Sequence, residues 1–405
     1  MIAISESGSR VVALEEGKDP AAAFKSSHAR ALPLRLVQFL VMFVVLGIGV
    51  SILSMHTIRF FGVQHVAPTA PSTIRPCFEE PNSLESRIRP PSNLLHAMND
   101  TELLWLASSA PQINDYPFKR VPKIAFMFLT KGPLPMEPLW ERFFKGHEGL
   151  YSIYVHSLPS YNANFSPSSV FHKRQIPSQV AEWGEMSMCD AERRLLANAL
   201  LDISNEWFVL LSEACIPLYN LSIVYHYLSR SRYSFMGSFD EIGPYGRGRY
   251  DGRMAPLVNL TEWRKGSQWF EINRKLAVRI VGDTTYYPKF RDFCKPACYV
   301  DEHYFQTMLS IETPHLLANR TLTYVDWSRG GAHPATFGKA DVTEEFFKKI
   351  AGSDTCLYNN QPTSLCFLFA RKFAPSALEP LLELASKQWS LNYIRSYILV
   401  TQLKY

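Results

Sequence analysis

Residues 123–130, KIAFMFLT, decide how the large C-terminal part of this chain folds. The run is apolar and β-favouring, and it closes in the loop KGPLP, which is typical of a strand buried on both faces of a parallel sheet. The segment MEPLWERFFKG, residues 136–146, predicts a following helix with an apolar inner face. A second strand is expected at residues 150–157, LYSIYVHS.

The same alternation continues along the chain. CDAERRLLANALLD, residues 189–202, is an amphipathic helix, and EWFVLLSEACIPLY, residues 206–219, predicts a third buried strand running into a loop. Strands and helices in this order predict an α/β sheet with right-handed crossovers. Because ligands bind at the carboxyl ends of such strands, residues 130–133, 156–157 and 212–216 are expected around one crevice.

Composition limits the classes of protein to consider. The chain has 405 residues, of which 47% are hydrophobic and 13% aromatic, so a substantial core is possible. The formal net charge is +5, and no block of Lys and Arg is present. Nucleic acid is therefore not an expected partner, because its backbone demands clustered positive charge.

A separate segment, residues 36–55, reads LVQFLVMFVVLGIGVSILSM without a charge. Twenty helical residues at 1.5 Å each span about the 30 Å of a bilayer's hydrocarbon core. A cleaved signal peptide would have a shorter apolar core nearer the terminus, and a buried soluble helix would carry a polar stripe. The segment therefore predicts an uncleaved single-pass anchor.

Basic residues flanking the segment favour a cytoplasmic N-terminus and a lumenal C-terminal part. Four precede it and two follow it over similar lengths: Lys18, Lys25, Arg30 and Arg35, against Arg59 and Arg75. The predicted divisions are a cytoplasmic tail (1–33), an anchor (34–56), a Pro/Ser-rich stem (57–118) and a lumenal domain (119–405). Within the stem, DTELLWLASSA predicts a short docking helix at residues 100–109 with Asp100 as its N-cap.

Glycosylation sequons and cysteines agree with a lumenal location. Five N-x-[ST] triplets follow the anchor, of which a subset is expected to be glycosylated: Asn99, Asn164, Asn220, Asn259 and Asn319. All seven cysteines also follow it, and an oxidising lumen permits disulfides. The Cys294/Cys298 pair is a weak metal signal without a second pair, so a disulfide or buried thiols are preferred and no metal is predicted.

A membrane-anchored α/β domain on a stem is the usual layout of a glycan-modifying enzyme. Many nucleotide-sugar transferases hold a divalent ion with an Asp-x-Asp pair, but this chain contains no such pair. Lys or Arg must then neutralise a departing diphosphate, and Arg371 and Lys372 are the best-placed candidates. The alternative for this doublet is an ordinary charged pair at a helix terminus.

Eight segments in order resemble the Core-2/I-branching β-1,6-N-acetylglucosaminyltransferase family (glycosyltransferase family 14), most closely its plant branch. They are KIAFMFLTKG, VAEWGE, LLSEACIPLY, SFMGSFD, WRKGSQWF, YVDEHYFQTML, WSRGGAHPATF and CFLFARKFAPSALEPLL, between about residues 123 and 385. The resemblance implies a GT-A type fold, a Golgi type II membrane protein, an inverting mechanism and a UDP-sugar donor used without a metal or other cofactor.

The resemblance also implies roles for individual residues. Glu302, in the segment Asp301–His303, would be the general base, whereas without the resemblance this segment also suits the N-cap and first turn of a helix. Basic residues would bind the donor diphosphate: Lys131, Arg371 and Lys372. Acceptor contacts would come from Glu213, Trp269 and Trp327, and Cys356 and Cys366 occupy the place of a short family disulfide.

Two positions depart from the animal enzymes of that family. A second phosphate-contacting Arg falls near Thr363 here, and an Asp after the second strand is Ser157. The expected function is transfer of N-acetylglucosamine from UDP to a glycan hydroxyl. UDP-glucuronic acid or another UDP-sugar is the alternative donor, a non-catalytic glycan-binding scaffold is the alternative class, and a sulfotransferase lacks its phosphate loop.

Overall fold

The computed structural model describes residues 34–61, 93–111, 116–295, 298–352 and 355–387. The chain forms two compact units, Met1–Glu80 and Pro81–Tyr405. The predicted cytoplasmic tail and the stem segment 62–92 lie outside the described residues.

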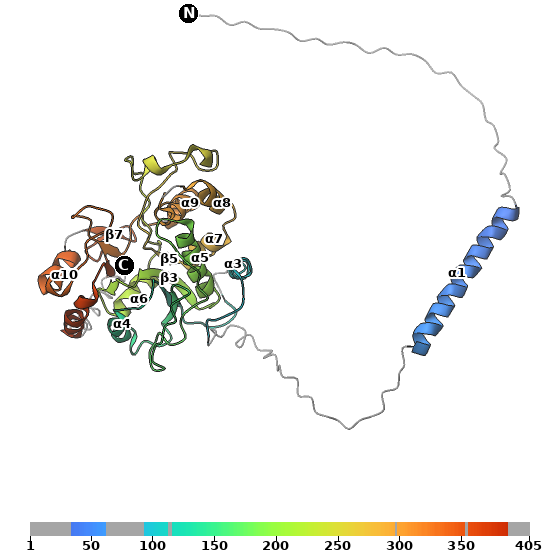
Figure 1. Cartoon of the computed structure of the whole chain (residues 1–405), viewed down its shortest axis with the longest axis horizontal. Helices are drawn as coiled ribbons and strands as arrows, with labels where there is room; N and C mark the ends of the chain where they lie inside the picture. Colours follow the sequence, from blue (N-terminus) through green and yellow to red (C-terminus); the bar gives the residue numbers. More distant parts are fainter. Residues whose placement is uncertain (1–33, 62–92, 112–115, 296–297, 353–354, 388–405) are drawn as a thin grey trace, which may run out of the picture. The chain divides into compact units, whose positions relative to one another are not determined.

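The first unit contributes one described helix, α1 (Leu34–Phe61) (Figure 1). Its stretch Gln38–Met55 has a mean hydropathy of 2.3, and its side chains are exposed. A helix of this length and composition can cross a membrane, and is compatible with the predicted single-pass anchor.

The second unit is built on a mostly parallel sheet of order β2–β1–β3–β5. Its strands are β1 (Lys123–Leu129), β2 (Tyr151–His156), β3 (Asn205–Ser212) and β5 (Glu271–Asn273). β1 pairs in parallel with both β2 and β3, as predicted, and β5 closes the other edge antiparallel to β3. The predicted α/β class with a parallel sheet is therefore confirmed.

Side chains along β1 alternate between two cores, because successive residues of a strand point to opposite faces. Ala125 and Met127 belong to one apolar cluster, and Ile124, Phe126 and Phe128 to the other. Both faces of the strand are buried, which explains why its sequence is a continuous apolar run.

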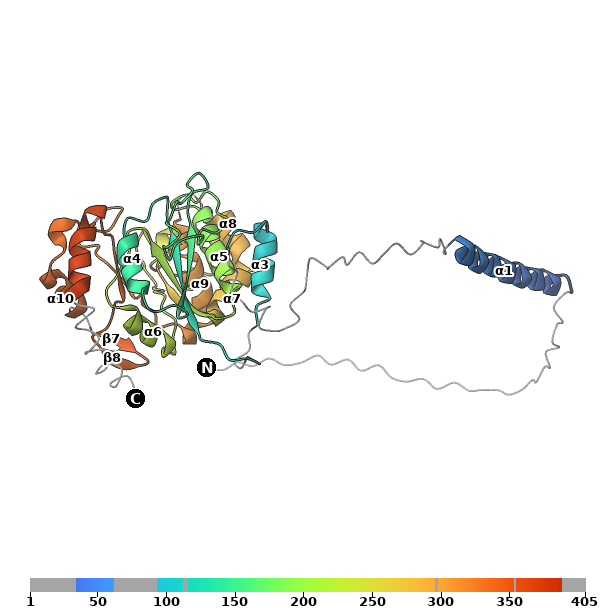
Figure 2. The same ribbon diagram turned by 90° about the horizontal axis from the view of Figure 1, so that it is seen from below.

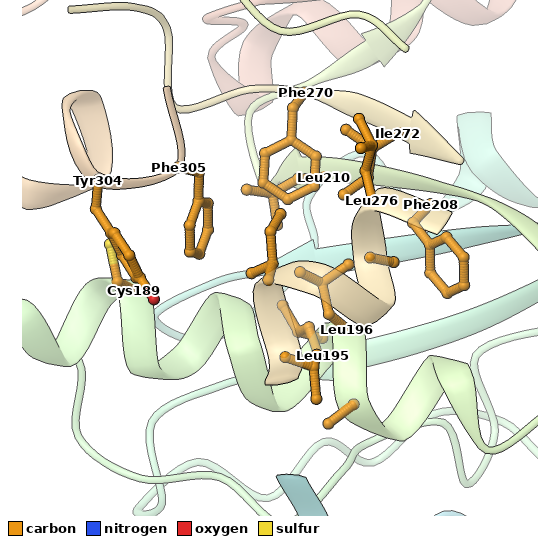
Figure 3. Packing of buried hydrophobic residues seen from close by; sticks show 14 of the residues in the cluster. Cys189, Leu195, Leu196, Phe208, Leu210, Phe270, Ile272, Leu276, Tyr304 and Phe305 are labelled. Atoms are coloured by element: carbon orange, nitrogen blue, oxygen red, sulfur yellow. The ribbon is translucent and has the colours of Figure 1, made fainter. Parts of the chain in front are cut away.

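Helices cover both faces of the sheet (Figure 2). One side carries α5 (Met186–Leu200), α7 (Arg274–Gly282) and α9 (Tyr304–Glu312), with α3 (Asp100–Ser108) and α8 (Tyr286–Phe293) packed near them. The other side carries α4 (Glu137–Phe144), α6 (Leu221–Ser229) and α10 (Glu344–Gly352). Figure 3 shows α5 presenting Leu195 and Leu196 to Phe208 and Leu210 of β3.

A second, smaller sheet has the order β4–β9–β6, and its strand β4 is the next strand along the chain after β3. It is formed by β4 (Ile216–Pro217), β9 (Phe369–Arg371) and β6 (Thr323–Val325), and a hairpin of β7 (Cys356–Tyr358) and β8 (Gln361–Thr363) follows α10. The segment 206–219, predicted as a buried strand running into a loop, forms β3 and a turn at residues 213–215, and the short strand β4 after the turn belongs to the other sheet.

The docking helix predicted in the stem is present as α3, with a different cap. Asn99, not Asp100, is the N-cap: its side chain accepts a hydrogen bond from the Glu102 amide, and Glu102 accepts one from the Asn99 amide. Asp100 instead pairs with Arg194 of α5 through two 2.7 Å contacts. The docking helix thus belongs to the folded unit.

Within the described part of the chain two disulfides are formed, Cys294–Cys298 and Cys356–Cys366. The second is the predicted family bridge, and the first resolves the C-x3-C spacing as a disulfide. Cys189 and Cys215 are buried free thiols, and Cys77 lies outside the described residues.

The five sequon asparagines occupy two kinds of position. Asn164, Asn259 and Asn319 lie on exposed loops, whereas the side chains of Asn99 and Asn220 cap α3 and α6. Glycosylation of a subset of the five stays a prediction.

Candidate active site

A cavity of about 850 Å³ opens at the carboxyl ends of the parallel strands. Its lining includes Thr130 after β1, Ser157 after β2 and Glu213 after β3. The crevice predicted from the strand ends is therefore present, because parallel strands deliver their following loops to one edge. The cavity is also lined by every residue predicted to be catalytic, donor-binding or acceptor-binding: Lys131, Glu213, Trp269, Glu302, Trp327, Arg371 and Lys372.

Glu302 ends a 3-10 turn, η3 (Val300–Glu302), immediately before α9. Its Oε2 accepts a hydrogen bond from Arg249 Nη1 at 3.0 Å and lies 3.8 Å from Lys265 Nζ. The side chain is 27% exposed. His303 is the N-cap of α9, so neither Asp301 nor Glu302 caps that helix, although both lie in the 3-10 turn that leads into it.

Asp301, next to the candidate base, lines the same cavity but is almost completely buried. Burial, followed by the neighbouring Glu302 charge, raises the pKa of Asp301 to about 7. Its Oδ1 is a buried atom without a hydrogen-bond partner among the described residues. The two adjacent carboxyls thus differ in environment: Glu302 is partly exposed and paired with cations, and Asp301 is enclosed.

The basic doublet lies at the end of a strand, not at a helix terminus. Arg371 is the last residue of β9, the central strand of the smaller sheet, and Lys372 follows it. Burial lowers the pKa of both side chains, and the Arg371 charge lowers that of Lys372 further. Two cations held close together in a partly dry cavity favour an anionic ligand.

Trp269 supports this cationic pair. Its indole is only 6% exposed, and the Arg371 guanidinium carbon lies 4.1 Å from its ring centroid. This is a cation–π arrangement that holds Arg371 in place. The indole therefore offers little open surface to an acceptor, whereas Trp327, after β6, is 52% exposed at the cavity.

The two departures from the animal enzymes lie in different places. Ser157 lines the cavity, and its Oγ accepts a hydrogen bond from Gln175 Nε2 at 2.8 Å. Thr363 ends β8, and its carbonyl faces the Cys356–Cys366 bridge, outside the cavity lining.

Sequence reasoning missed several residues of this site. Arg249 and Lys265 come from segments distant from Glu302, and only Lys265 fell in a segment quoted for the resemblance. Trp183 and His333 also line the cavity, and both stand in quoted segments, VAEWGE and WSRGGAHPATF. Their exposure at one cavity is visible only in three dimensions.

Within the described ranges, no group of three or more His, Cys, Asp and Glu side chains is arranged to hold a metal ion.

Comparison with known proteins decides the family. The family model described as Core-2/I-Branching enzyme matches residues 124–351, more than half of the chain. This chain belongs to the Core-2/I-branching enzyme family. The match begins in β1 and ends in α10, so it spans the parallel sheet and most of the cavity lining.

A curated relative agrees. Glycosyltransferase BC10 of Oryza sativa subsp. japonica is 37% identical over 309 residues, covering 65% of this chain and 76% of the relative. This Core-2/I-branching enzyme is therefore a glycosyltransferase related to a plant member, as the resemblance implied. The non-catalytic scaffold and the sulfotransferase lose their basis.

Proposed function

We propose that this Core-2/I-branching enzyme transfers a sugar, N-acetylglucosamine by family default, from a UDP-sugar to a hydroxyl of a glycan. The proposal includes inversion at the transferred carbon, no requirement for a metal ion, a GT-A type fold and a Golgi type II topology. One observation carries it: a partly exposed carboxylate and a cluster of three basic side chains line the same cavity at the strand ends.

Glu302 is the proposed general base. The acceptor oxygen attacks the anomeric carbon, the bond from that carbon to the phosphate oxygen breaks, and UDP leaves with the electron pair. Glu302 takes the proton of the acceptor hydroxyl. Arg249 donates to Oε2 and Lys265 lies 3.8 Å from it, whereas Oε1 accepts no hydrogen bond from the described residues.

Lys131, Arg371 and Lys372 are the proposed donor-binding residues. The negative charge that develops on the departing diphosphate needs compensation, and preorganised cations supply it without reorganising at the moment of reaction. The absence of an Asp-x-Asp pair from the sequence supports basic side chains in place of a metal ion. Glu213 and Trp327 are the proposed acceptor contacts, and Trp269 acts by positioning Arg371.

The anchor helix and the lumenal sequons support the proposed location. The stretch Gln38–Met55 is long and apolar enough to cross a bilayer, and all five sequons follow it. Two disulfides in the second unit fit an oxidising compartment.

The deciding experiment measures UDP release by the full-length chain in detergent, with a panel of UDP-sugars and glycan acceptors, in the presence and absence of EDTA. Turnover with UDP-N-acetylglucosamine that survives EDTA is expected. Loss of turnover in EDTA, restored by a divalent ion, would contradict metal independence. Preference for UDP-glucuronic acid would select the alternative donor, and no turnover with any donor would overturn the proposal.

A further inference from the structure

Three large aromatic side chains are about half exposed at the cavity: Trp183 (50%), Phe239 (52%) and Trp327 (52%). Exposed apolar surface gathered around a cavity marks a binding surface more often than scattered exposed residues do. Trp327 already has a proposed role with the acceptor. Trp183 has none, and it makes ring contacts with Tyr299 and His333.

Trp183 is held by rings from two other segments. Its ring centroid lies 4.8 Å from that of Tyr299, in an edge-on arrangement, and 5.1 Å from that of His333. The next residue, Gly184, has a φ of +82°, and a Cβ there would lie 3.3 Å from the Tyr299 ring. Glycine therefore permits the close approach that fixes the indole beside Tyr299.

The same contacts connect Trp183 to the candidate base. Tyr299 directly precedes the turn that ends in Glu302, and the Arg249 guanidinium carbon lies 4.3 Å from the Tyr299 ring centroid. Arg249 is the residue that donates to Glu302. Tyr299 and Arg249 thus link the Trp183 indole to the carboxylate proposed to take the proton of the acceptor hydroxyl.

Trp183 is also joined to the loop that carries Trp327. His333 lies in this loop, whose ends are brought together by the Ala335 amide donating to the Asp326 carbonyl at 2.8 Å. The ring contact between Trp183 and His333 therefore links the two exposed indoles, Trp183 and Trp327, at one cavity. A single sugar ring would need only one of these two aromatic surfaces.

We propose that the Trp183 indole binds the sugar next to the reacting one, so that the acceptor is a glycan chain of two or more residues. This inference rests on the proposed function and names its substrate class. Indole faces supply a large apolar contact area at low cost in side-chain entropy, which suits the apolar faces of sugar rings. Gln268, also in the lining, donates its Nε2 to Glu192 at 2.7 Å and leaves its amide oxygen to accept from a sugar hydroxyl.

The test measures kcat/KM with the full-length chain in detergent. The acceptors are the monosaccharides glucose, galactose and N-acetylglucosamine and the neutral oligosaccharides of two to six residues made from them. For the wild type, kcat/KM should rise from one residue to two. In Trp183→Ala, this gain should fall by about 10-fold, equivalent to about 1.4 kcal/mol. Trp183→Phe should retain most of it because an aromatic face remains.

Trp105→Ala is the matched control, since Trp105 lies on α3, is 70% exposed and is outside the cavity lining. It should leave the length dependence unchanged. A wild type without length dependence, or equal losses on single sugars and chains in Trp183→Ala, would overturn the inference. Weakened UDP affinity as the main effect of Trp183→Ala would assign the indole to uracil and also overturn it.

Failure of the proposed function is distinguishable from failure of this inference. If no UDP-sugar is turned over, binding of the same sugars is measured by titration calorimetry. If oligosaccharides bind more tightly than single sugars to the wild type, but not to Trp183→Ala, sugar binding by the Trp183 indole is supported even without sugar transfer. Equal binding by the two proteins would refute it.

Discussion

The contrast between two adjacent carboxyls defines the candidate chemistry at the residue scale. Glu302 is partly exposed beside two cations, and Asp301 is enclosed with a pKa raised to about 7 by burial. Burial disfavours the charged form of Asp301. Glu302, which is partly exposed at the cavity, is therefore the better placed of the two for the proposed base role.

Replacing Glu302 by Gln should lower kcat by about 10²- to 10⁴-fold, the usual contribution of a general base. The affinity for UDP should change little, because the diphosphate is proposed to bind the basic cluster. Steady-state UDP release and UDP titration calorimetry measure the two effects. Glu312→Gln, at the end of α9 and paired with Arg279, is the control. Near-normal turnover in Glu302→Gln would remove it from the base role.

Replacing Lys372 by Ala should weaken UDP binding by about 10-fold or more, since hydrogen bonds to charged groups contribute about 1.5–3 kcal/mol. Titration calorimetry with UDP is the measurement. Lys339→Ala is the control, because Lys339 forms an exposed ion pair with Glu379 and such pairs contribute about 0–1 kcal/mol. An unchanged UDP affinity in Lys372→Ala would place the diphosphate elsewhere.

At the element scale, α3 joins the predicted stem to the catalytic unit. Leu103 and Ala107 are buried against α5 and α7, and Asp100 pairs with Arg194. The helix alone is too short to be stable in water, so these contacts hold it. A boundary drawn after the Pro-rich segment, at residue 119, would strip this helix from the face it covers.

A fragment of residues 93–405 should therefore be more stable than one of residues 119–405. Leu103→Ala in the longer fragment should lower the free energy of unfolding by about 2–5 kcal/mol, the usual cost of removing a fully buried leucine side chain. Urea unfolding followed by circular dichroism compares them. Trp105→Ala, on the exposed side of α3, should cost about 0.5 kcal/mol or less. Equal midpoints for the two fragments would show that α3 docks without stabilising the unit.

At the scale of the whole unit, Glu271 connects the two sheets. It lies in β5 of the central sheet, and its carboxylate accepts hydrogen bonds from the Leu322 amide and the Thr323 hydroxyl at the start of β6. Burial raises the pKa of Glu271 to about 8. The folded state thus keeps this carboxyl protonated at a pH where the unfolded chain has ionised it.

The sign of the resulting pH dependence follows from linkage. Because the folded pKa lies above the unfolded value of 4.5, the stabilising contribution is complete below about pH 4.5 and is lost as the pH rises through about 8. The loss is a few kcal/mol at most. Two buried histidines act in the opposite direction below pH 6.5, because burial lowers the pKa of His156 to about 4 and that of His303 to about 3.

Glu271→Gln isolates the carboxyl from the histidines. As the pH is raised from 5 to 8, the free energy of unfolding of the wild type should fall relative to that of this variant. Urea unfolding at several pH values in this range is the measurement. A constant difference would mean that Glu271 titrates alike in the folded and unfolded chains.

Local sequence pattern by itself determined the parallel part of the central sheet and the position of the cavity. The apolar run at residues 123–130 and the helical periodicity at 189–202 specify elements through neighbours along the chain, and the strand-end rule then places residues 130, 157 and 213 together. Ordered segments resembling the family supplied Glu302, Arg371 and Lys372, all of which line that cavity.

Only the tertiary structure decided what surrounds those residues. Arg249 reaches Glu302 from 53 positions away, Trp269 is covered by Arg371, and Asn99 caps α3 where Asp100 pairs with Arg194. Trp183 meets Tyr299 and His333 from segments far apart in the chain. Burial and charge pairing depend on which distant segments the fold brings within a few ångströms, and no local period or propensity encodes that proximity.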